Sequence, residues 1–197
     1  MPTAPAQRSE RGNQMTTATQ TATSTWTIDP THSIAEFAVK HLVITTVKGR
    51  FRDLEGTLQI DEERPENSSV SASIDVASID TNVPDRDVHL RSDDFFNAEQ
   101  YPKIIFRSTR VEPVDDTNYK VHGDLTIRDV TRPVVLNTEF EGDVVDPRGD
   151  RRAAFTATTQ ISRNEFGVKW NQLIETGGAM VGDNIKITLH IEAVRQG

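Results

Sequence analysis

The sequence predicts a single all-β domain that closes into a small antiparallel barrel. Apolar and polar residues alternate along several segments after Trp26, and clusters of turn-forming residues separate these segments. Alternation of this kind gives a strand one buried face and one solvated face, which is typical of antiparallel sheets. About seven or eight short strands at such spacing predict a barrel or a sandwich.

The alternation is clearest in four segments, which we expect to be strands: residues 68–76, 118–127, 153–161 and 184–194. In the last of them, Ile185 and Ile187 share one face, opposite Lys186 and Thr188. Turn signals, in which Pro, Gly, Asn and Asp gather, lie at residues 62–67, 113–118, 146–150 and 177–178.

Small residues recur on the faces that we expect to point inward. They are Ala72, Ala77, Gly123, Ala153 and Ala157. In a barrel, small inward residues can leave room for a ligand. They can equally pack against bulky partners across the core, and the sequence leaves both alternatives open.

One segment, residues 84–96 (PDRDVHLRSDDFF), breaks the alternation and predicts a short helix or helical loop that begins at Pro84. Its polar side chains could form a rim at which Arg86 or Arg91 binds an anionic oxygen and His89 donates a hydrogen bond. Alternatively, the segment stabilises itself through Arg–Asp pairs, in which Arg91 pairs with Asp87 or Asp94.

A catalytic interpretation of this segment pairs His89 with Asp85, Asp87 or Asp93 as general acid and base. The sequence offers no specific nucleophile for such a reaction, and it lacks the G-x-S-x-G, G-x-x-x-x-G-K, G-x-G-x-x-G and H-E-x-x-H motifs. We therefore expect a binding protein without a cofactor. A lipid-modifying or hydrolytic enzyme that uses His89 and a nearby Asp is the alternative.

The histidines show no spacing typical of metal ligands on one helix or strand. His32, His41 and His89 could still meet in space, but we expect no metal site. A basic stretch, residues 48–52 (KGRFR), lies close in sequence to Lys40 and His41. It could line an opening of the barrel, or protect a solvated strand edge against pairing.

Composition divides the chain into a tail and a domain. Residues 1–24 are rich in Thr, Ala, Gln and Ser, so we expect them to be disordered and the barrel to occupy residues 25–197. The net charge of −8 argues against binding to nucleic acid and against electrostatic docking on anionic lipid.

The chain has no cysteine, no apolar run near the ~18 residues of a transmembrane helix and no signal-peptide pattern. These features predict a cytoplasmic protein without an integral membrane segment. A homodimer is compatible with the sequence.

Six ordered blocks of the sequence resemble the YceI-like family. They are WTIDPTHSIAEFAVKHL (26–42), VKGRFRDLEGTL (47–58), the RD-x-HLRS-x-DFF run (86–96), YPKIIFRS (101–108), GDLTIRDVTRPV (123–134) and SRNEFGV (162–168). The resemblance covers nearly everything from Trp26 to the end of the chain. Many relatives are exported, whereas this sequence shows no signal peptide.

The resemblance implies a lipocalin-like, extended antiparallel β-barrel of about eight strands, to which the short helical insertion is attached. It also implies a long apolar tunnel that binds a polyisoprenoid, an isoprenoid quinone or a lipid-like chain non-covalently, for transport or storage. The polar end of such a ligand would meet the rim, because a buried unpaired polar group is costly. The ligand-binding residues that we expect are Lys40, His41, His89, Arg91, Phe95, Gly123 and Ala157.

Overall fold

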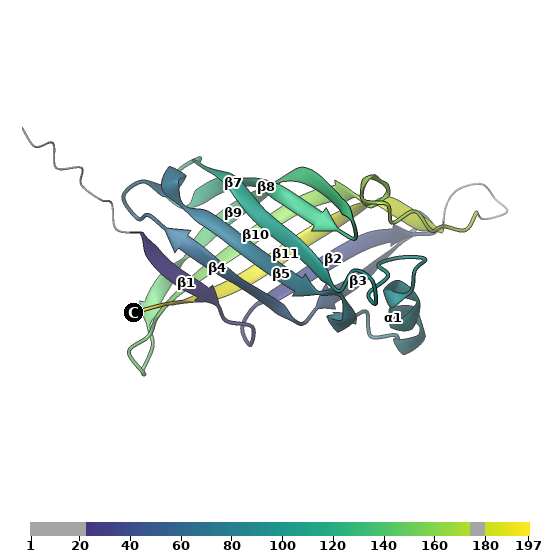
Figure 1. Ribbon diagram of the computed structural model, residues 1–197, viewed down its shortest axis with the longest axis horizontal. Helices are drawn as coiled ribbons and strands as arrows, with labels where there is room; N and C mark the ends of the chain where they lie inside the picture. Colours follow the sequence, from purple (N-terminus) through teal and green to yellow (C-terminus); the bar gives the residue numbers. More distant parts are fainter. Residues whose placement is uncertain (1–22, 174–179) are drawn as a thin grey trace, which may run out of the picture.

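The computed structural model describes residues 23–173 and 180–197. In this part of the chain, 11 strands form one antiparallel sheet in the order β1-β4-β5-β7-β8-β9-β10-β11-β2-β3-β6. Because β11 pairs with β1 as well as with β10 and β2, the eight strands from β1 to β11 in this order form a closed ring (Figure 1). The predicted antiparallel barrel is therefore confirmed.

The strands of the described residues are β1 (Ser24–Ile28), β2 (Ile34–His41), β3 (Thr45–Phe51), β4 (Leu54–Ile60), β5 (Ser69–Asp75), β6 (Ile79–Asp80), β7 (Lys103–Pro113), β8 (Asn118–Ile127), β9 (Val130–Val145), β10 (Arg151–Ser162) and β11 (Val181–Arg195). The helical elements are the α-helix α1 (Pro84–Arg91) and the 3-10 helices η1 (Pro65–Asn67), η2 (Val76–Ser78) and η3 (Asn164–Phe166).

The four segments in which polar and apolar residues alternate are all strands: they fall on β5, β8, β10 and β11. The expected faces are also found, since Ala153 and Ala157 on β10 are buried. The expectation that Ala77 points inward was wrong. The strand β5 ends at Asp75, whose carboxylate accepts a hydrogen bond from the Ala77 amide at 2.8 Å, and η2 then turns the chain so that Ala77 is exposed.

The edge of the barrel that faces β11 is made of two strands. Residues 181–190 of β11 pair with β2, and residues 193–195 pair with β1. Residues 29–33 connect β1 to β2, and strand pairing along this side of β11 is interrupted there. At this break, the amide of Asp29 and the hydroxyl of Ser33 donate to the carbonyl of Glu192 at 2.8 and 3.1 Å. The backbone carbonyl of Glu192 on β11 is therefore hydrogen-bonded at the point where the neighbouring strand changes from β2 to β1.

The short strand β6 continues the sheet beyond β3, and Asp80 holds the two strands together. One carboxylate oxygen accepts from Arg50 Nη2 at 3.1 Å and from Arg52 Nη2 at 2.5 Å, and the other accepts from the Asn82 amide at 2.9 Å. These hydrogen bonds, with that of the Asn82 amide as the largest cause, lower the pKa of Asp80 to about 2. The basic stretch at residues 48–52 thus lies between β2 and β6 for part of its length.

The helix α1 begins at Pro84, as predicted, and lies at one end of the barrel (Figure 1). Asp87 in its first turn is buried and accepts hydrogen bonds from the amide and the hydroxyl of Thr81 at 2.9 and 2.5 Å. Arg86 donates to the carbonyl of Thr81 at 2.8 Å. This network fixes α1 to the chain that follows β6.

Two expectations fall on residues outside the described ranges. The predicted tail, residues 1–24, lies outside them except for its last two residues. Of these, Ser24 belongs to β1, where its hydroxyl donates to the Ile60 carbonyl at 3.2 Å. The predicted turn at Gly177 and Gly178 also lies outside the described ranges. No helix among the described residues is long and apolar enough to cross a membrane.

We predict that Asp80→Asn destabilises the protein at neutral pH and that this loss fades in acid. The pKa of an unfolded aspartate is about 3.9, whereas that of Asp80 in the fold is about 2, so folding favours the charged form. Its stabilisation is present above the unfolded pKa and is lost as the pH falls through the folded pKa. Urea unfolding of both proteins from neutral pH down to about pH 2 measures this difference. Asp93→Asn, at an exposed carboxylate, is the control, and a difference that stays constant across the range would contradict this role of Asp80.

Candidate ligand-binding site

A large cavity lies inside the barrel. Its volume is about 510 Å³, within the range of about 300–1,000 Å³ that is usual for small-molecule sites. All eight strands of the ring contribute inward side chains to its wall, and most of these are aliphatic or aromatic. A barrel of about eight strands can be filled by its own side chains or can hold one ligand. This barrel is hollow.

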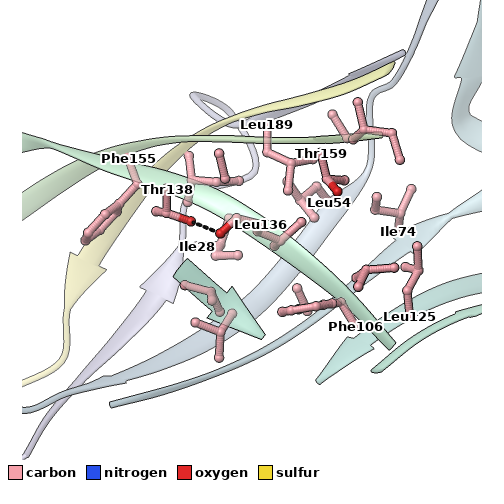
Figure 2. A pocket seen from close by; sticks show the side chains of 18 of the residues that line it. Ile28, Leu54, Ile74, Phe106, Leu125, Leu136, Thr138, Phe155, Thr159 and Leu189 are labelled. Atoms are coloured by element: carbon pink, nitrogen blue, oxygen red, sulfur yellow. Dashed lines mark hydrogen bonds between the residues drawn. The ribbon is translucent and has the colours of Figure 1, made fainter. Parts of the chain in front are cut away.

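The middle of the cavity offers few polar groups. Figure 2 shows side chains of the wall directed into the cavity, among them Leu54 and Phe106. Of the residues labelled there, Thr138 and Thr159 alone carry a side-chain oxygen, and Thr138 Oγ1 donates to the Leu136 carbonyl at 3.4 Å. Such a surface favours an apolar chain, because removing apolar area from water stabilises by about 25 cal/mol per Å².

Aromatic side chains cover the end of the cavity next to α1. Phe95 and Phe96, which follow the helix, line the cavity, and the ring of Trp170 packs against that of Phe95 with centroids 5.1 Å apart. We call these three residues the aromatic cap. Phe96 also packs edge-on against Phe51, with centroids 5.8 Å apart, and Arg128 donates to the Phe95 carbonyl at 3.2 Å. The cap is therefore fixed to β3 and to the β8–β9 turn.

Arg163 is a buried cation at the same end, only 5% exposed, and it lines the cavity. Its guanidinium donates to the carbonyls of Val168, Trp170, Val181 and Gly182 at 2.7, 2.9, 3.1 and 2.9 Å. Burial lowers the pKa of Arg163 from its ordinary value. The side chain holds the segment after η3 against the start of β11. We did not predict this role, although Arg163 continues the inward alternation of β10.

The opposite end of the cavity is lined by carboxylates. Glu62 after β4, Asp116 in the β7–β8 turn and Asp143 on β9 are exposed and line the cavity there, and we call them the acidic mouth. Arg151 lies among them and donates to Asp143 at 2.7 Å and to Glu62 at 2.9 Å. Because two carboxylates share this one cation, the mouth remains acidic.

Two of the predicted ligand-binding residues line the cavity: Phe95 in the aromatic cap and Ala157 on β10. Gly123 on β8 is buried beside Phe106. A Cβ at Gly123 would lie 2.4 Å from Phe106 Cζ and 2.5 Å from the carbonyl oxygen of Arg107. Both alternatives for the small inward residues are thus realised: the inward alanines of β5 and β10 border the cavity, and Gly123 accommodates a bulky neighbour.

Lys40 and His41 are not among the described residues that line the cavity. Lys40 is exposed on β2 and lies opposite Thr46 in the register with β3. His41 is half-buried at the end of β2, between Thr45 on β3 and Val181 on β11. Contact of either side chain with a ligand stays a prediction.

His89 lies on α1 behind the aromatic cap. Its ring packs edge-on against Phe95 and Trp170, at centroid distances of 5.0 and 4.8 Å. Its Nε2 atom is 2.8 Å from Asp94 Oδ2, so its acidic partner is not one of the three aspartates that the catalytic interpretation named. Neither His89 nor Asp94 is among the described residues of the cavity wall.

Arg91 also lies on α1, where it donates to the carbonyl of Ala77 at 3.2 Å. The alternative in which Arg91 pairs with Asp87 or Asp94 is not seen among the described residues, because Asp87 binds Thr81 and Asp94 binds the histidine of α1. Arg91 does not line the cavity in that part of the chain, and its rim role stays a prediction.

His32, one of the histidines considered for a metal site, lies beside Asp29 and Glu192. Its Nδ1 atom is 3.0 Å from Asp29 Oδ2. Arg152 donates to both carboxylates, at 2.8 and 2.6 Å. The hydrogen bonds from His32 and Arg152 lower the pKa of Asp29 well below its usual range. The group is an ion-pair network that fixes the break between β1 and β2 to β10 and β11.

We predict that Gly123→Ala destabilises the barrel by about 1–3 kcal/mol, the usual cost of overpacking a core. The added methyl group must displace both the ring of Phe106 and the backbone at Arg107. The free energy of unfolding, from urea titration, measures the loss. Phe106→Leu shortens the obstructing side chain, so the double variant Gly123→Ala/Phe106→Leu should recover part of the lost free energy of unfolding. Strictly additive effects of the two substitutions would contradict the contact.

Comparison with known proteins agrees with this architecture. The model of the YceI-like domain matches residues 26–193. The UPF0312 protein plu2095 of Photorhabdus laumondii subsp. laumondii is 42% identical over 138 residues, which are 70% of this chain and 71% of the relative.

Two solved structures share the fold. The YCEI protein of Campylobacter jejuni has a TM-score of 0.70 at 31% identity, covering 80% of this chain and 90% of that one. A polyisoprenoid binding domain from Saccharophagus degradans, implicated in plant cell wall breakdown, has a TM-score of 0.66 and covers 87% of this chain and 98% of that one. At 14% identity, the latter likeness supports the fold alone. From the family match, the relative and the closed barrel, the chain belongs to the YceI-like domain family.

Proposed function

We propose that the protein binds the apolar chain of an amphiphilic isoprenoid or a similar lipid inside the barrel, non-covalently, as a carrier or a store. The observation that carries this proposal is the cavity of about 510 Å³ with its largely aliphatic and aromatic wall. The shared fold of the Saccharophagus degradans polyisoprenoid binding domain supports it.

Burial supplies the driving force in this proposal. Each methylene group that leaves water contributes about 0.8 kcal/mol, and a chain of several prenyl units contains many such groups. The middle of the wall has few hydrogen-bonding groups, so a hydrocarbon fits there and a charged group does not. Binding needs no reaction, and the wall contributes shape and apolar surface.

The charges at the ends of the cavity bear on the polar end of the ligand. Glu62, Asp116 and Asp143 form the acidic mouth, and Arg151 is already paired with Glu62 and Asp143. A diphosphate at this mouth would be repelled, whereas an alcohol or a carbonyl could hydrogen-bond to the same groups. We therefore propose an uncharged head group at the acidic mouth, in place of the anionic one expected at Arg91.

The cavity is tested by Ala157→Phe, which places a ring where the chain of the ligand would lie. We expect affinity for geranylgeraniol, a neutral isoprenoid, to fall by about tenfold or more, because the ring excludes a comparable apolar area. Calorimetric titration measures affinity, and thermal unfolding reports whether the barrel persists. Ala154→Phe, on the outward face of the same strand, is the matched control. If folded Ala157→Phe binds as tightly as the wild type, the cavity is not the site.

The head group is tested by comparing geranylgeraniol with geranylgeranyl diphosphate on the wild type and on Asp116→Asn/Asp143→Asn. The wild type should bind the alcohol more tightly than the diphosphate. In the double variant the difference between the two affinities should be smaller, because two charges that repel the diphosphate are removed. Gln variants of the exposed residues Glu139 and Glu141, on the outward face of β9, serve as controls. Tighter binding of the diphosphate to the wild type would contradict an uncharged head group at this mouth.

A further inference from the structure

The hairpin between β2 and β3 carries exposed aliphatic side chains at its turn. It projects at the end of the barrel opposite the acidic mouth (Figure 1). Val43 and Ile44 in this turn are 69% and 80% exposed. Leu173, which is 83% exposed, lies near this turn. The Leu42 amide donates to the Met180 carbonyl, and the Met180 amide donates to the carbonyl of Gln172, the neighbour of Leu173. We call Val43, Ile44 and Leu173 the apolar tip.

The backbone of this turn is unfavourable for the residues that occupy it. Leu42 and Val43 have φ angles of 50° and 66°. This left-handed region suits Gly and Asn, and a β-branched residue there is unusual. A turn selected for stability alone would not combine this conformation with large apolar side chains in water, so the turn points to an apolar partner.

Three lysines lie on the outward face of the adjoining strands. The register places Lys48 on β3 and Lys186 on β11 on either side of Ala38 on β2, and Lys40 follows two residues later on the same face. All three lysines are exposed, and none forms an ion pair with another described residue. Charges beyond a Debye length of about 8 Å are largely screened. The local charge therefore matters more here than the net charge of −8.

Two acidic residues lie near these lysines. Asp183, in the irregular part of β11, accepts hydrogen bonds from the hydroxyl of Ser162 and the amide of Asn164. Glu36 lies further along β2, and its carboxylate is 3.9 Å from His190 Nε2. The three lysines outnumber these two carboxylates, so the outward face of β2, β3 and β11 next to the hairpin is basic.

We propose that the apolar tip docks on a lipid bilayer that contains anionic lipid. Val43 and Ile44 would insert at the boundary of head groups and acyl chains, and Lys40, Lys48 and Lys186 would face the lipid phosphates. Apolar side chains flanked by Lys are the usual composition of an interfacial membrane anchor. A protein partner fits less well, because a stable interface buries about 800 Å² on each side, more than a hairpin tip offers.

Docking at this end brings the cavity close to the bilayer. Val39 on β2 and Val181 on β11, next to the hairpin, line the cavity. Docking itself stands on the tip and the lysines, and does not depend on ligand binding.

The absence of cysteine from the chain allows a single labelled position. Ile44→Cys in the full chain carries an environment-sensitive nitrobenzoxadiazole dye, and Val144→Cys is the matched control, because Val144 is 62% exposed at the acidic end. Vesicles of phosphatidylcholine with phosphatidylglycerol should brighten the dye and shift its emission to the blue at position 44 and leave it unchanged at position 144. No change at position 44, or equal change at both positions, would overturn the proposal.

Co-sedimentation with the same vesicles gives the size of the effect. Val43→Ser/Ile44→Ser should lower the partition coefficient by about tenfold or more, and Val144→Ser/Val145→Ser should leave it unchanged. Each of Lys40→Gln, Lys48→Gln and Lys186→Gln should lower it by about fivefold on phosphatidylglycerol vesicles and leave it unchanged on phosphatidylcholine alone. Wild-type partitioning of the tip variant would overturn docking. That variant should still bind geranylgeraniol, so failure of docking and failure of ligand binding are distinguishable.

Discussion

The strand β11 closes the barrel, because it pairs with β10 along one edge and with β2 and β1 along the other. Through β1 and β2 together, β11 is paired along both of its edges, so its backbone groups are satisfied within the sheet. Each strand of the ring then has one face toward a shared interior, and that face must be apolar. The cavity exists because several inward positions of this ring, such as Ala72 and Ala157, hold small side chains with nothing large packed over them.

The ends of the cavity have different chemistry because different connections form them. At one end, the aromatic cap and Arg163 fix the chain after α1 and after η3 to the barrel, and the buried guanidinium is satisfied by backbone carbonyls. At the other end, the β4–β5 connection, the β7–β8 turn and β9 place carboxylates around the opening. An apolar middle, a packed end and a polar mouth are together suited to an amphiphile whose chain is buried and whose head group meets water.

Periodicity identified the strands β5, β8, β10 and β11 because each has one face on the cavity and one in solvent. Pro84 identified the start of α1 because the ring of proline suits the first turn of a helix. The break between β1 and β2 was not predicted, since it depends on a hydrogen bond between Ser33 and Glu192, which are 159 residues apart. The surroundings of Gly123 depend in the same way on Phe106 of the neighbouring strand. Local sequence shows that a residue is small and faces inward; pairing decides whether a ligand or a side chain takes the space.

The site residues on α1 and at the end of β2 show the same limit. The family blocks placed His89, Arg91 and Lys40 near strand ends or the helix, but not the direction of their side chains. In the fold, His89 packs behind the cap, Arg91 binds a backbone carbonyl, and Lys40 is exposed on β2. The ligand-sized space is instead bordered by residues that are unremarkable in sequence, chiefly alanine, leucine and isoleucine on many strands.

Native mass spectrometry of the purified full chain, followed by lipid extraction, tests the central claim most directly. A barrel that holds an apolar chain should carry one small molecule per protein, released when the protein unfolds and replaced by added geranylgeraniol. A chain that stays at its bare mass after incubation with geranylgeraniol and with lipid extracts would contradict the claim that this cavity is a ligand site.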